Sequence, residues 1–215
     1  MTSDAAVLAA IDLSARSLRL PSVHSRAQAL AGEAERDHAT YLEFLANVLA
    51  AESDDREERR RQGRIAAAAF PRLKRLSDFD LAAATSVNAA TIAMLKSGGY
   101  LERGEPAVML GDSGTGKSHL LIRLGAAACE QGRSVRYVTC AQLVNELAEA
   151  ADERPLSKLV ARYGRVDLLL LDELGYVALD ARGAELLFQI LTEREEKSSV
   201  ATASHVSPGG PSSPQ

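Results

Sequence analysis

The chain has 215 residues, 46% of them hydrophobic and only 4% aromatic, so it has room for one domain plus an appendage with a mainly aliphatic core. Its formal net charge of −4 does not indicate nucleic-acid binding by the chain as a whole, and any basic surface must be local. No stretch approaches the ~18 apolar residues of a membrane helix, and Asp12 interrupts the apolar run near the N-terminus, so we expect a cytoplasmic protein with no membrane partner.

The N-terminal part of the sequence predicts three helices. Residues 4–38 are rich in Ala, Leu, Arg and Glu and predict two helices separated at Leu20-Pro21. Thr40 and Glu43 form a capping box, in which each side chain satisfies a free amide of the other residue at the start of a third helix. We expect this helix to continue through Ala69 with a bend near Gly63. One of its faces carries apolar residues at a spacing that predicts a buried stripe. These residues are Tyr41, Leu42, Leu45, Val48 and Leu49.

The segment from Arg56 to Arg75 is the most basic part of the chain. It holds eight basic residues and only two acidic ones, Glu57 and Glu58, which gives a local charge of +6. Positive charge of this density attracts the phosphate backbone of DNA through counterion release, without reading its sequence. A solvated helix face or a subunit contact would explain the same charges. The candidate DNA-contacting residues are Arg56, Arg59, Arg60, Arg61, Arg64, Arg72, Lys74 and Arg75.

The pattern of elements changes after the basic segment. The expected parts of the chain are an N-terminal helical arm (1–75), a connector (76–103), a P-loop core (104–204) and a disordered tail (205–215). Within the connector, Phe79 and Leu81 are apolar anchors. A short helix is expected around 91–95, before the break at Ser97-Gly98-Gly99.

From residue 104 onward, expected strands alternate with expected helices, which is typical of an α/β fold with a parallel sheet and helical crossovers. The expected strands are 106–110, 134–138, 168–171 and 198–203. The four leucines of the third strand predict burial on both faces of the sheet. Four helices are expected between the strands. The first ends at Gly132, and the second begins with a capping box at Thr139. The third begins at Pro155, and Asp180 caps the fourth.

The stretch from Gly111 to Ser118 reads Gly-Asp-Ser-Gly-Thr-Gly-Lys-Ser, the P-loop pattern G-x-x-x-x-G-K-[ST]. Its glycines allow backbone N–H groups to surround phosphate oxygens. Lys117 can reach the β- and γ-phosphates, and the Ser118 hydroxyl can ligate Mg²⁺. A glycine-rich turn that fits the pattern by chance lacks the strand before and the helix after that are expected here. The candidate nucleotide-binding residues are Gly111, Asp112, Ser113, Gly114, Thr115, Gly116, Lys117 and Ser118.

Two acidic residues, Asp172 and Glu173, follow the four leucines of the third expected strand. The carboxyl ends of parallel strands face one crevice, so these side chains should meet the P-loop. We expect Asp172 to hold Mg²⁺ together with Ser118. Glu173 should orient or deprotonate the attacking water, and Lys117 shares the catalytic role. A glutamate at this position favours water over a bound acceptor as the nucleophile.

Besides the P-loop, five more specific strings stand out. They are Leu18-Arg19-Leu20-Pro21, Tyr41-Leu42-Glu43-Phe44-Leu45, Arg56-Glu57-Glu58-Arg59-Arg60, Phe70-Pro71-Arg72-Leu73-Lys74 and Asp172-Glu173-Leu174-Gly175-Tyr176. Together these strings resemble the IstB-like ATP-binding proteins, helper ATPases of bacterial insertion sequences that are related to the DnaC helicase loaders within the AAA+ class. The resemblance covers most of residues 10–204. It implies an ATPase that uses ATP and Mg²⁺, assembles as a homo-oligomer on duplex DNA and directs a transposase to its target.

The sequence departs from the family pattern near its end. His205 stands where the family carries a sensor asparagine, and the fifth strand and the helices with the arginine finger do not follow. The resemblance therefore implies an edge position for the P-loop strand, and hydrolysis that is more impaired than binding. Two alternatives remain: a DnaC-like helicase loader, and a non-catalytic nucleotide-binding subunit that interferes with the active form.

Overall fold

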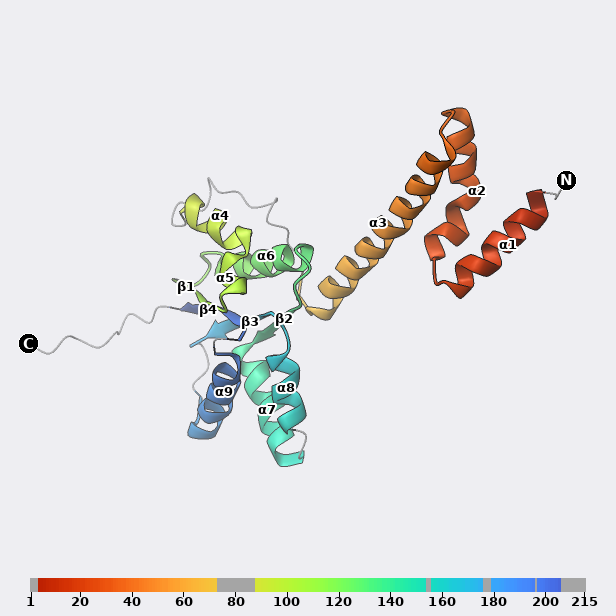
Figure 1. Cartoon of the computed structure of the whole chain (residues 1–215). Helices are drawn as coiled ribbons and strands as arrows, with labels where there is room; N and C mark the ends of the chain where they lie inside the picture. Colours follow the sequence, from red (N-terminus) through yellow and green to blue (C-terminus); the bar gives the residue numbers. More distant parts are fainter. Residues whose placement is uncertain (1–3, 73–87, 154–155, 176–178, 196, 206–215) are drawn as a thin grey trace, which may run out of the picture. The chain divides into compact units, whose positions relative to one another are not determined.

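The structure, a computed structural model, describes residues 4–72, 88–153, 156–175, 179–195 and 197–205 (Figure 1). The chain divides into two compact units, Met1–Gln62 and Gly63–Gln215, which we call the helical unit and the P-loop unit. The boundary precedes the one drawn from the sequence at residue 75. Phe79 and Leu81, together with Lys74, Arg75, Pro155 and the tail after His205, lie outside the described residues.

The helical unit contains α1 (Asp4–Ser17), α2 (Pro21–Arg36) and most of α3 (Tyr41–Ala67). The expected break before Pro21 is confirmed, since Leu20 lies between α1 and α2 and proline begins the second helix, where its missing N–H costs nothing. The capping box is also confirmed. Glu43 Oε2 accepts from Thr40 N at 2.7 Å, and Thr40 Oγ1 accepts from Glu43 N at 3.3 Å.

A buried carboxylate, Glu52, joins α3 to the start of α2. The residue is 4% exposed, and its Oε2 accepts from the backbone N–H of Ser22 at 2.8 Å and of Val23 at 3.3 Å. These amides belong to the first turn of α2, where no helical carbonyl can accept from them. Glu52 Oε1 lies 3.1 Å from Arg56 and 3.6 Å from Arg59. Burial alone raises the pKa of this carboxyl, but the two backbone hydrogen bonds and Arg56 outweigh burial and hold the pKa below its ordinary value.

The prediction of a buried stripe on α3 was wrong at most of its positions. Val48 is buried at 8% exposure, whereas Tyr41 is 94% exposed and Leu42, Leu45 and Leu49 are also exposed. The buried face of α3 instead runs through Val48 and Glu52, one turn apart. Helical spacing shows which side chains share a face, but it does not show how much of that face a neighbouring helix covers.

The P-loop unit is built on four parallel strands in the order β1-β4-β3-β2, so the expected α/β class is confirmed. The strands are β1 (Ala107–Gly111), β2 (Val135–Thr139), β3 (Leu168–Leu174) and β4 (Ser199–His205). The helices are α4 (Ala89–Ser97), α5 (Gly99–Glu102), α6 (Lys117–Glu130), α7 (Cys140–Glu153), α8 (Leu156–Gly164) and α9 (Ala181–Arg194). The expected cap of α9 is confirmed, because Asp180 Oδ1 accepts from Gly183 N at 2.7 Å.

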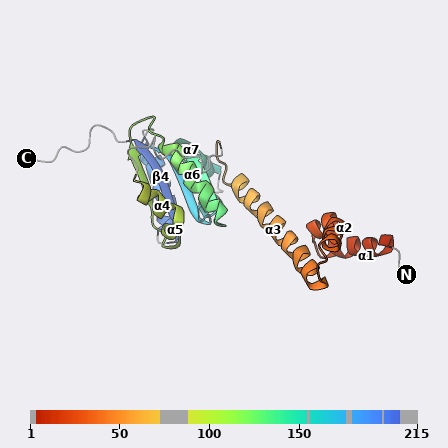
Figure 2. The ribbon, with the colours of Figure 1, turned by 90° about the horizontal axis from the view of Figure 1, so that it is seen from above.

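Strand β3 lies in the centre of the core and is buried on both faces, as its leucine run predicts. Leu168 and Leu170 pack in one cluster with residues of α6, while Leu169 and Leu171 pack in a second with α7, α8 and α9. Figure 1 shows this layering, with α6 on one face of the sheet and α7 to α9 on the other, and Figure 2 is seen from the side of α6. Successive leucines of β3 therefore pack on opposite faces of the sheet, up to the acidic residues at the end of the strand.

The residues just after α3 belong to the P-loop unit. Ala68 is fully buried, and its carbonyl accepts from Tyr137 N at 2.8 Å beside the edge strand β2. Phe70 packs over Gly125 of α6, where an added Cβ would lie 2.9 Å from the Phe70 ring and 2.4 Å from Leu170 Cδ1. This packing explains why the helical unit ends before residue 75.

The P-loop strand β1 is an edge strand of the sheet formed by the described residues, as the resemblance implied. It pairs with β4 on one side, and its Val108 and Leu110 side chains are exposed.

Replacing Glu52 by Gln should destabilise the start of α2 by about 1–3 kcal/mol, because hydrogen bonds that involve a charged group are among the stronger ones. The depressed pKa of Glu52 also makes its contribution to stability depend on pH. The contribution of Glu52 is fully present above the unfolded-state value of about 4.3 and is lost as pH falls through the lower folded-state pKa. Amide hydrogen exchange at Ser22 and Val23 should therefore show an acid-dependent loss of protection that Glu52→Gln lacks. Glu57→Gln, an exposed control on the same helix, should behave like the parent; equal exchange in all three chains would contradict this role.

Candidate nucleotide-binding site

The P-loop connects β1 to α6 and depends on backbone angles that glycine adopts easily. Gly114 and Gly116 have φ of 79° and 86°, in the left-handed region that a Cβ disfavours. Gly116 is also the N-cap of α6. The free amides and the positive dipole end of α6 therefore face the loop, an arrangement that suits an anionic phosphate.

The Lys117 ammonium lies across the loop. Its Nζ donates to the carbonyls of Gly111 at 2.7 Å and Asp112 at 2.6 Å. Thr115 Oγ1 also donates to Asp112 O at 2.9 Å, which closes the turn. The positive charge is thus held beside the loop amides, within the hollow where phosphate would bind.

Ser118 and Asp172 meet across the gap between α6 and β3. Ser118 Oγ donates to Asp172 Oδ1 at 2.9 Å, and Asp172 is almost fully buried. A hydroxyl and a carboxylate oxygen are hard donors of the kind that Mg²⁺ prefers, and Mg²⁺ usually adds phosphate oxygens and waters to one or two such ligands. The pair fits a magnesium ion that bridges protein and nucleotide phosphates.

Glu173 lies at a β-bulge in the register between β3 and β4, between Leu171 and Leu174. Its φ of 60° is in the left-handed region, which is uncommon for a residue with a side chain and is often retained at functional sites. Ser204 Oγ on β4 donates to Leu174 O at 2.6 Å and supports the bulge. The irregular backbone exposes Glu173, whereas Asp172 before it remains buried.

The P-loop and the acidic pair Asp172-Glu173 line one hollow of about 310 Å³. Its volume falls at the lower end of the range for small-molecule sites, roughly 300–1,000 Å³. Residues from the loop, from α6 and from the ends of β3 and β4 line it. They are Ser113, Gly114, Gly116, Lys117, Ser118, His119, Asp172, Glu173 and Ala203.

Tyr137 of β2 is a site residue that sequence reasoning missed. Its hydroxyl donates to Asp172 Oδ2 at 2.8 Å. Burial raises the pKa of Tyr137 far above its ordinary value, and the hydrogen bond to Asp172 raises it further, so the phenol keeps its proton. No local motif marks this tyrosine; only the pairing of β2 with β3 places it beside Asp172.

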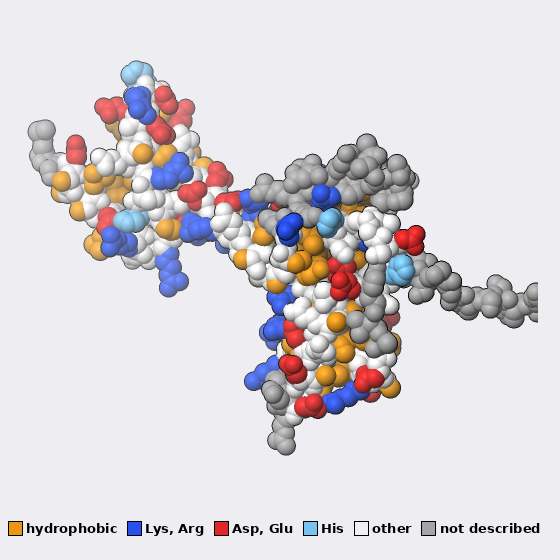
Figure 3. Space-filling model, turned by 180° about the vertical axis from the view of Figure 1, so that it is seen from behind, with side chains coloured by type: hydrophobic (Ala, Val, Ile, Leu, Met, Phe, Trp, Pro, Cys, Tyr) orange, Lys and Arg blue, Asp and Glu red, His pale blue; other side chains and the backbone are white. Residues whose placement is uncertain are grey.

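Most of the arginines expected to contact DNA have acidic partners within α3. Arg56 and Arg59 pair with the buried Glu52, and Arg60 lies 3.9 Å from Glu57. Arg61 donates through two nitrogens to Glu58, each at 2.7 Å. On the face drawn in Figure 3, Arg side chains of the helical unit lie among Asp and Glu side chains. The charge of +6 counted from the sequence already includes Glu57 and Glu58, and the pairing with Glu52 lowers it by one further charge.

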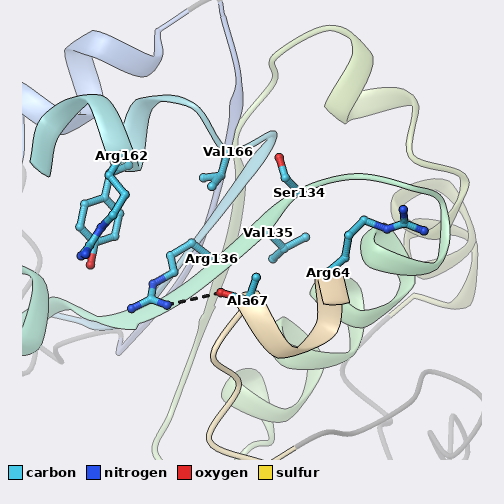
Figure 4. A pocket seen from close by; sticks show the side chains of 8 residues that line it. Arg64, Ala67, Ser134, Val135, Arg136, Arg162 and Val166 are labelled. Atoms are coloured by element: carbon cyan, nitrogen blue, oxygen red, sulfur yellow. Dashed lines mark hydrogen bonds between the residues drawn. The ribbon is translucent and has the colours of Figure 1, made fainter. Parts of the chain in front are cut away.

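The other described members of the basic segment lie in the P-loop unit. Arg72 is exposed, whereas Arg64 Nε donates to Cys129 O at 3.0 Å at the end of α6. Arg64 also borders a second hollow, of about 230 Å³, shown in Figure 4. Arg136 lines the same hollow and donates to Ala67 O at 3.4 Å. This hollow shares no lining residue with the P-loop hollow.

Solved structures show which class of protein has this fold. The chain aligns over 62% of its length with the crystal structure of a DNA replication initiation factor, at a TM-score of 0.54 and 25% identity, covering 43% of that chain. AMPPCP-bound DnaA from Aquifex aeolicus aligns over 60% with a TM-score of 0.52 and 26% identity, covering 41% of that chain. A DnaC helicase loader aligns over 56% with a TM-score of 0.50 and 25% identity, covering 70% of that chain. The fold is that of the AAA+ P-loop proteins, and the chain spans less than half of the first two proteins.

Sequence comparison identifies the family within that class. The family model described as IstB-like ATP binding protein matches residues 13–210, and the chain belongs to this family. It is 33% identical over 192 residues to the IS5376 ATP-binding protein of Geobacillus stearothermophilus, covering 89% of this chain and 76% of the relative. It is 29% identical over 188 residues to the IS21 ATP-binding protein of Pseudomonas aeruginosa, covering 87% and 71%. The resemblance read from the sequence is confirmed.

Within the described part of the chain, no helix has the length and apolarity needed to cross a membrane.

The left-handed backbone of Glu173 predicts a difference between two substitutions that both remove its carboxylate. Glu173→Gly should be more stable than Glu173→Ala by about 1 kcal/mol, because alanine keeps the steric cost of a Cβ at positive φ. Thermal unfolding of the two variants side by side measures this difference. An alanine variant that is as stable as the glycine variant would show that the bulge relaxes at no cost.

Proposed function

We propose that this protein binds ATP with Mg²⁺ and acts as the helper ATPase of an insertion sequence, assembling on duplex DNA and working with a transposase. The observation that carries the proposal is the contact of Ser118 with Asp172 at 2.9 Å, beside a P-loop whose Lys117 is held within the same hollow. Membership of the IstB-like ATP-binding family supports the same nucleotide.

The arrangement assigns a role to each side chain. The amides at the start of α6 and the Lys117 ammonium would bind the β- and γ-phosphates. Ser118 and Asp172 would hold Mg²⁺, which supplies neutralisation of the charge that develops on the phosphates. Glu173 reaches the same hollow from the end of β3, where its carboxylate can orient a water toward the γ-phosphate.

The proposed macromolecular partners are supported by the relatives rather than by a contact in this chain. The relatives are named as insertion-sequence ATP-binding proteins, and one solved DnaA neighbour is bound to AMPPCP and single-stranded DNA. We assign duplex DNA to the basic segment, where Arg60, Arg61 and Arg72 do not pair with the buried Glu52 and can reach phosphates. Homo-oligomer formation on DNA and a cytoplasmic location complete the proposal.

A helicase loader is the second candidate. The DnaC helicase loader shares the fold at a TM-score of 0.50. The family match over residues 13–210 favours the insertion-sequence helper, because it includes α2 and α3 and not the P-loop unit alone. Pull-down with a transposase and with a replicative helicase separates the two functions.

Lys117→Ala should weaken ATP binding about 10- to 100-fold, because it removes hydrogen bonds from a charged group to the phosphates. Such a bond contributes ~1.5–3 kcal/mol. Titration with a fluorescent ATP analogue measures the change, with Lys158→Ala as an exposed-lysine control. Glu173→Gln should keep the parent's affinity and lose any phosphate release, since a positioned base contributes about 10²–10⁴-fold. Equal affinity in Lys117→Ala and the parent would contradict the assignment of the nucleotide site. ATP binding without phosphate release in the parent would indicate a non-catalytic subunit.

DNA binding should be independent of sequence and steeply dependent on salt, with a log–log slope of about −0.9 for each phosphate contacted. Replacing Arg60, Arg61 and Arg72 together by Gln should flatten this slope by up to about 2–3 units. Replacing Arg103 and Arg182, which pair with Glu105 and Asp152 on the P-loop unit, provides the control. An unchanged slope in the triple variant would contradict DNA binding by the basic segment and would indicate a subunit contact or a solvated face.

A further inference from the structure

Both oxygens of the Asp172 carboxylate accept hydrogen bonds from neighbouring residues. Oδ1 accepts from Ser118 Oγ and from the backbone N–H of Glu173, each at 2.9 Å. Oδ2 accepts from the Tyr137 hydroxyl at 2.8 Å. Asp172 is 2% exposed, so water has little access to replace a missing donor. The carboxylate is therefore oriented by donors from three sides.

Of the two side-chain donors, only the Tyr137 hydroxyl is independent of the metal. Ser118 is itself a proposed metal ligand, and the amide of Glu173 follows the bulged backbone of β3. Tyr137 stands on β2, the neighbouring strand, and does not line the hollow where the phosphates would bind. Its own position is fixed by its N–H bond to Ala68 O at 2.8 Å and by the packing of its ring against the core cluster beneath α6.

We propose that Tyr137 is a positioning residue that orients the Asp172 carboxylate toward Mg²⁺. The inference rests on the proposed ATP- and Mg²⁺-binding function and adds a residue that does not contact the nucleotide. Side chains that hold a metal ligand from behind change metal affinity about 10- to 100-fold when they are removed. Without the phenol, Oδ2 loses its donor in a buried place, and only the donors to Oδ1 orient the carboxylate.

The test compares two tyrosines in the same chain. Tyr137→Phe keeps the ring and removes only the hydroxyl. Tyr163→Phe is the matched control, because Tyr163 is a buried tyrosine whose hydroxyl also donates to a carboxylate, Glu146 Oε2, at 2.9 Å. Glu146 does not line the P-loop hollow. The dissociation constant of a fluorescent ATP analogue is measured for both variants and the parent, once in Mg²⁺ and once in EDTA, followed by a Mg²⁺ titration at fixed nucleotide.

Tyr137→Phe should require about 10- to 100-fold more Mg²⁺ for half-maximal binding and should match the parent in EDTA. Tyr163→Phe should match the parent in both conditions. A parallel loss of affinity in Mg²⁺ and in EDTA, or no change in either, would overturn the positioning role. A parent chain whose affinity is the same in Mg²⁺ and EDTA would instead refute the metal-dependent function on which the inference rests. Thermal unfolding of each variant separates a folding defect from a binding defect.

Discussion

The hydrogen bond between Ser118 and Asp172 is the contact on which the proposed chemistry depends. It joins the first turn of α6 to the end of β3, two elements that are far apart in sequence. The contact is possible because β1, β4 and β3 are parallel, so that the P-loop after β1 and the acidic end of β3 lie at the same edge of the sheet. A hydroxyl and a carboxylate held together in this way need only phosphate oxygens and waters to complete a magnesium site.

The helical unit depends on electrostatics more than on apolar packing. Glu52 is buried and satisfied by two amides of α2, and Arg56 and Arg59 balance its charge. These two arginines pair with Glu52, and their contact with DNA stays a prediction. Tyr41 and Leu42, at the start of α3, remain exposed.

The sequence was sufficient for features that local chemistry decides. The P-loop, the capping box at Thr40 and the two-faced burial of β3 follow from residue type and spacing, and the strands begin within one residue of their expected positions. The sequence was not sufficient for contacts between side chains that are far apart along the chain. Tyr137 meets Asp172 through strand register, and the hydrogen bonds from the amides of Ser22 and Val23 to Glu52 depend on how α2 packs on α3. Neither arrangement leaves a motif in the sequence.

The most direct test is the position of the metal. Crystals grown with a non-hydrolysable ATP analogue and Mn²⁺ in place of Mg²⁺ would give an anomalous difference map that locates the ion. The account predicts one peak within ligand distance of Ser118 Oγ and close to Asp172 Oδ1, beside the β- and γ-phosphates. A nucleotide bound in the loop with the metal held by other residues, or no metal between Ser118 and Asp172, would contradict it.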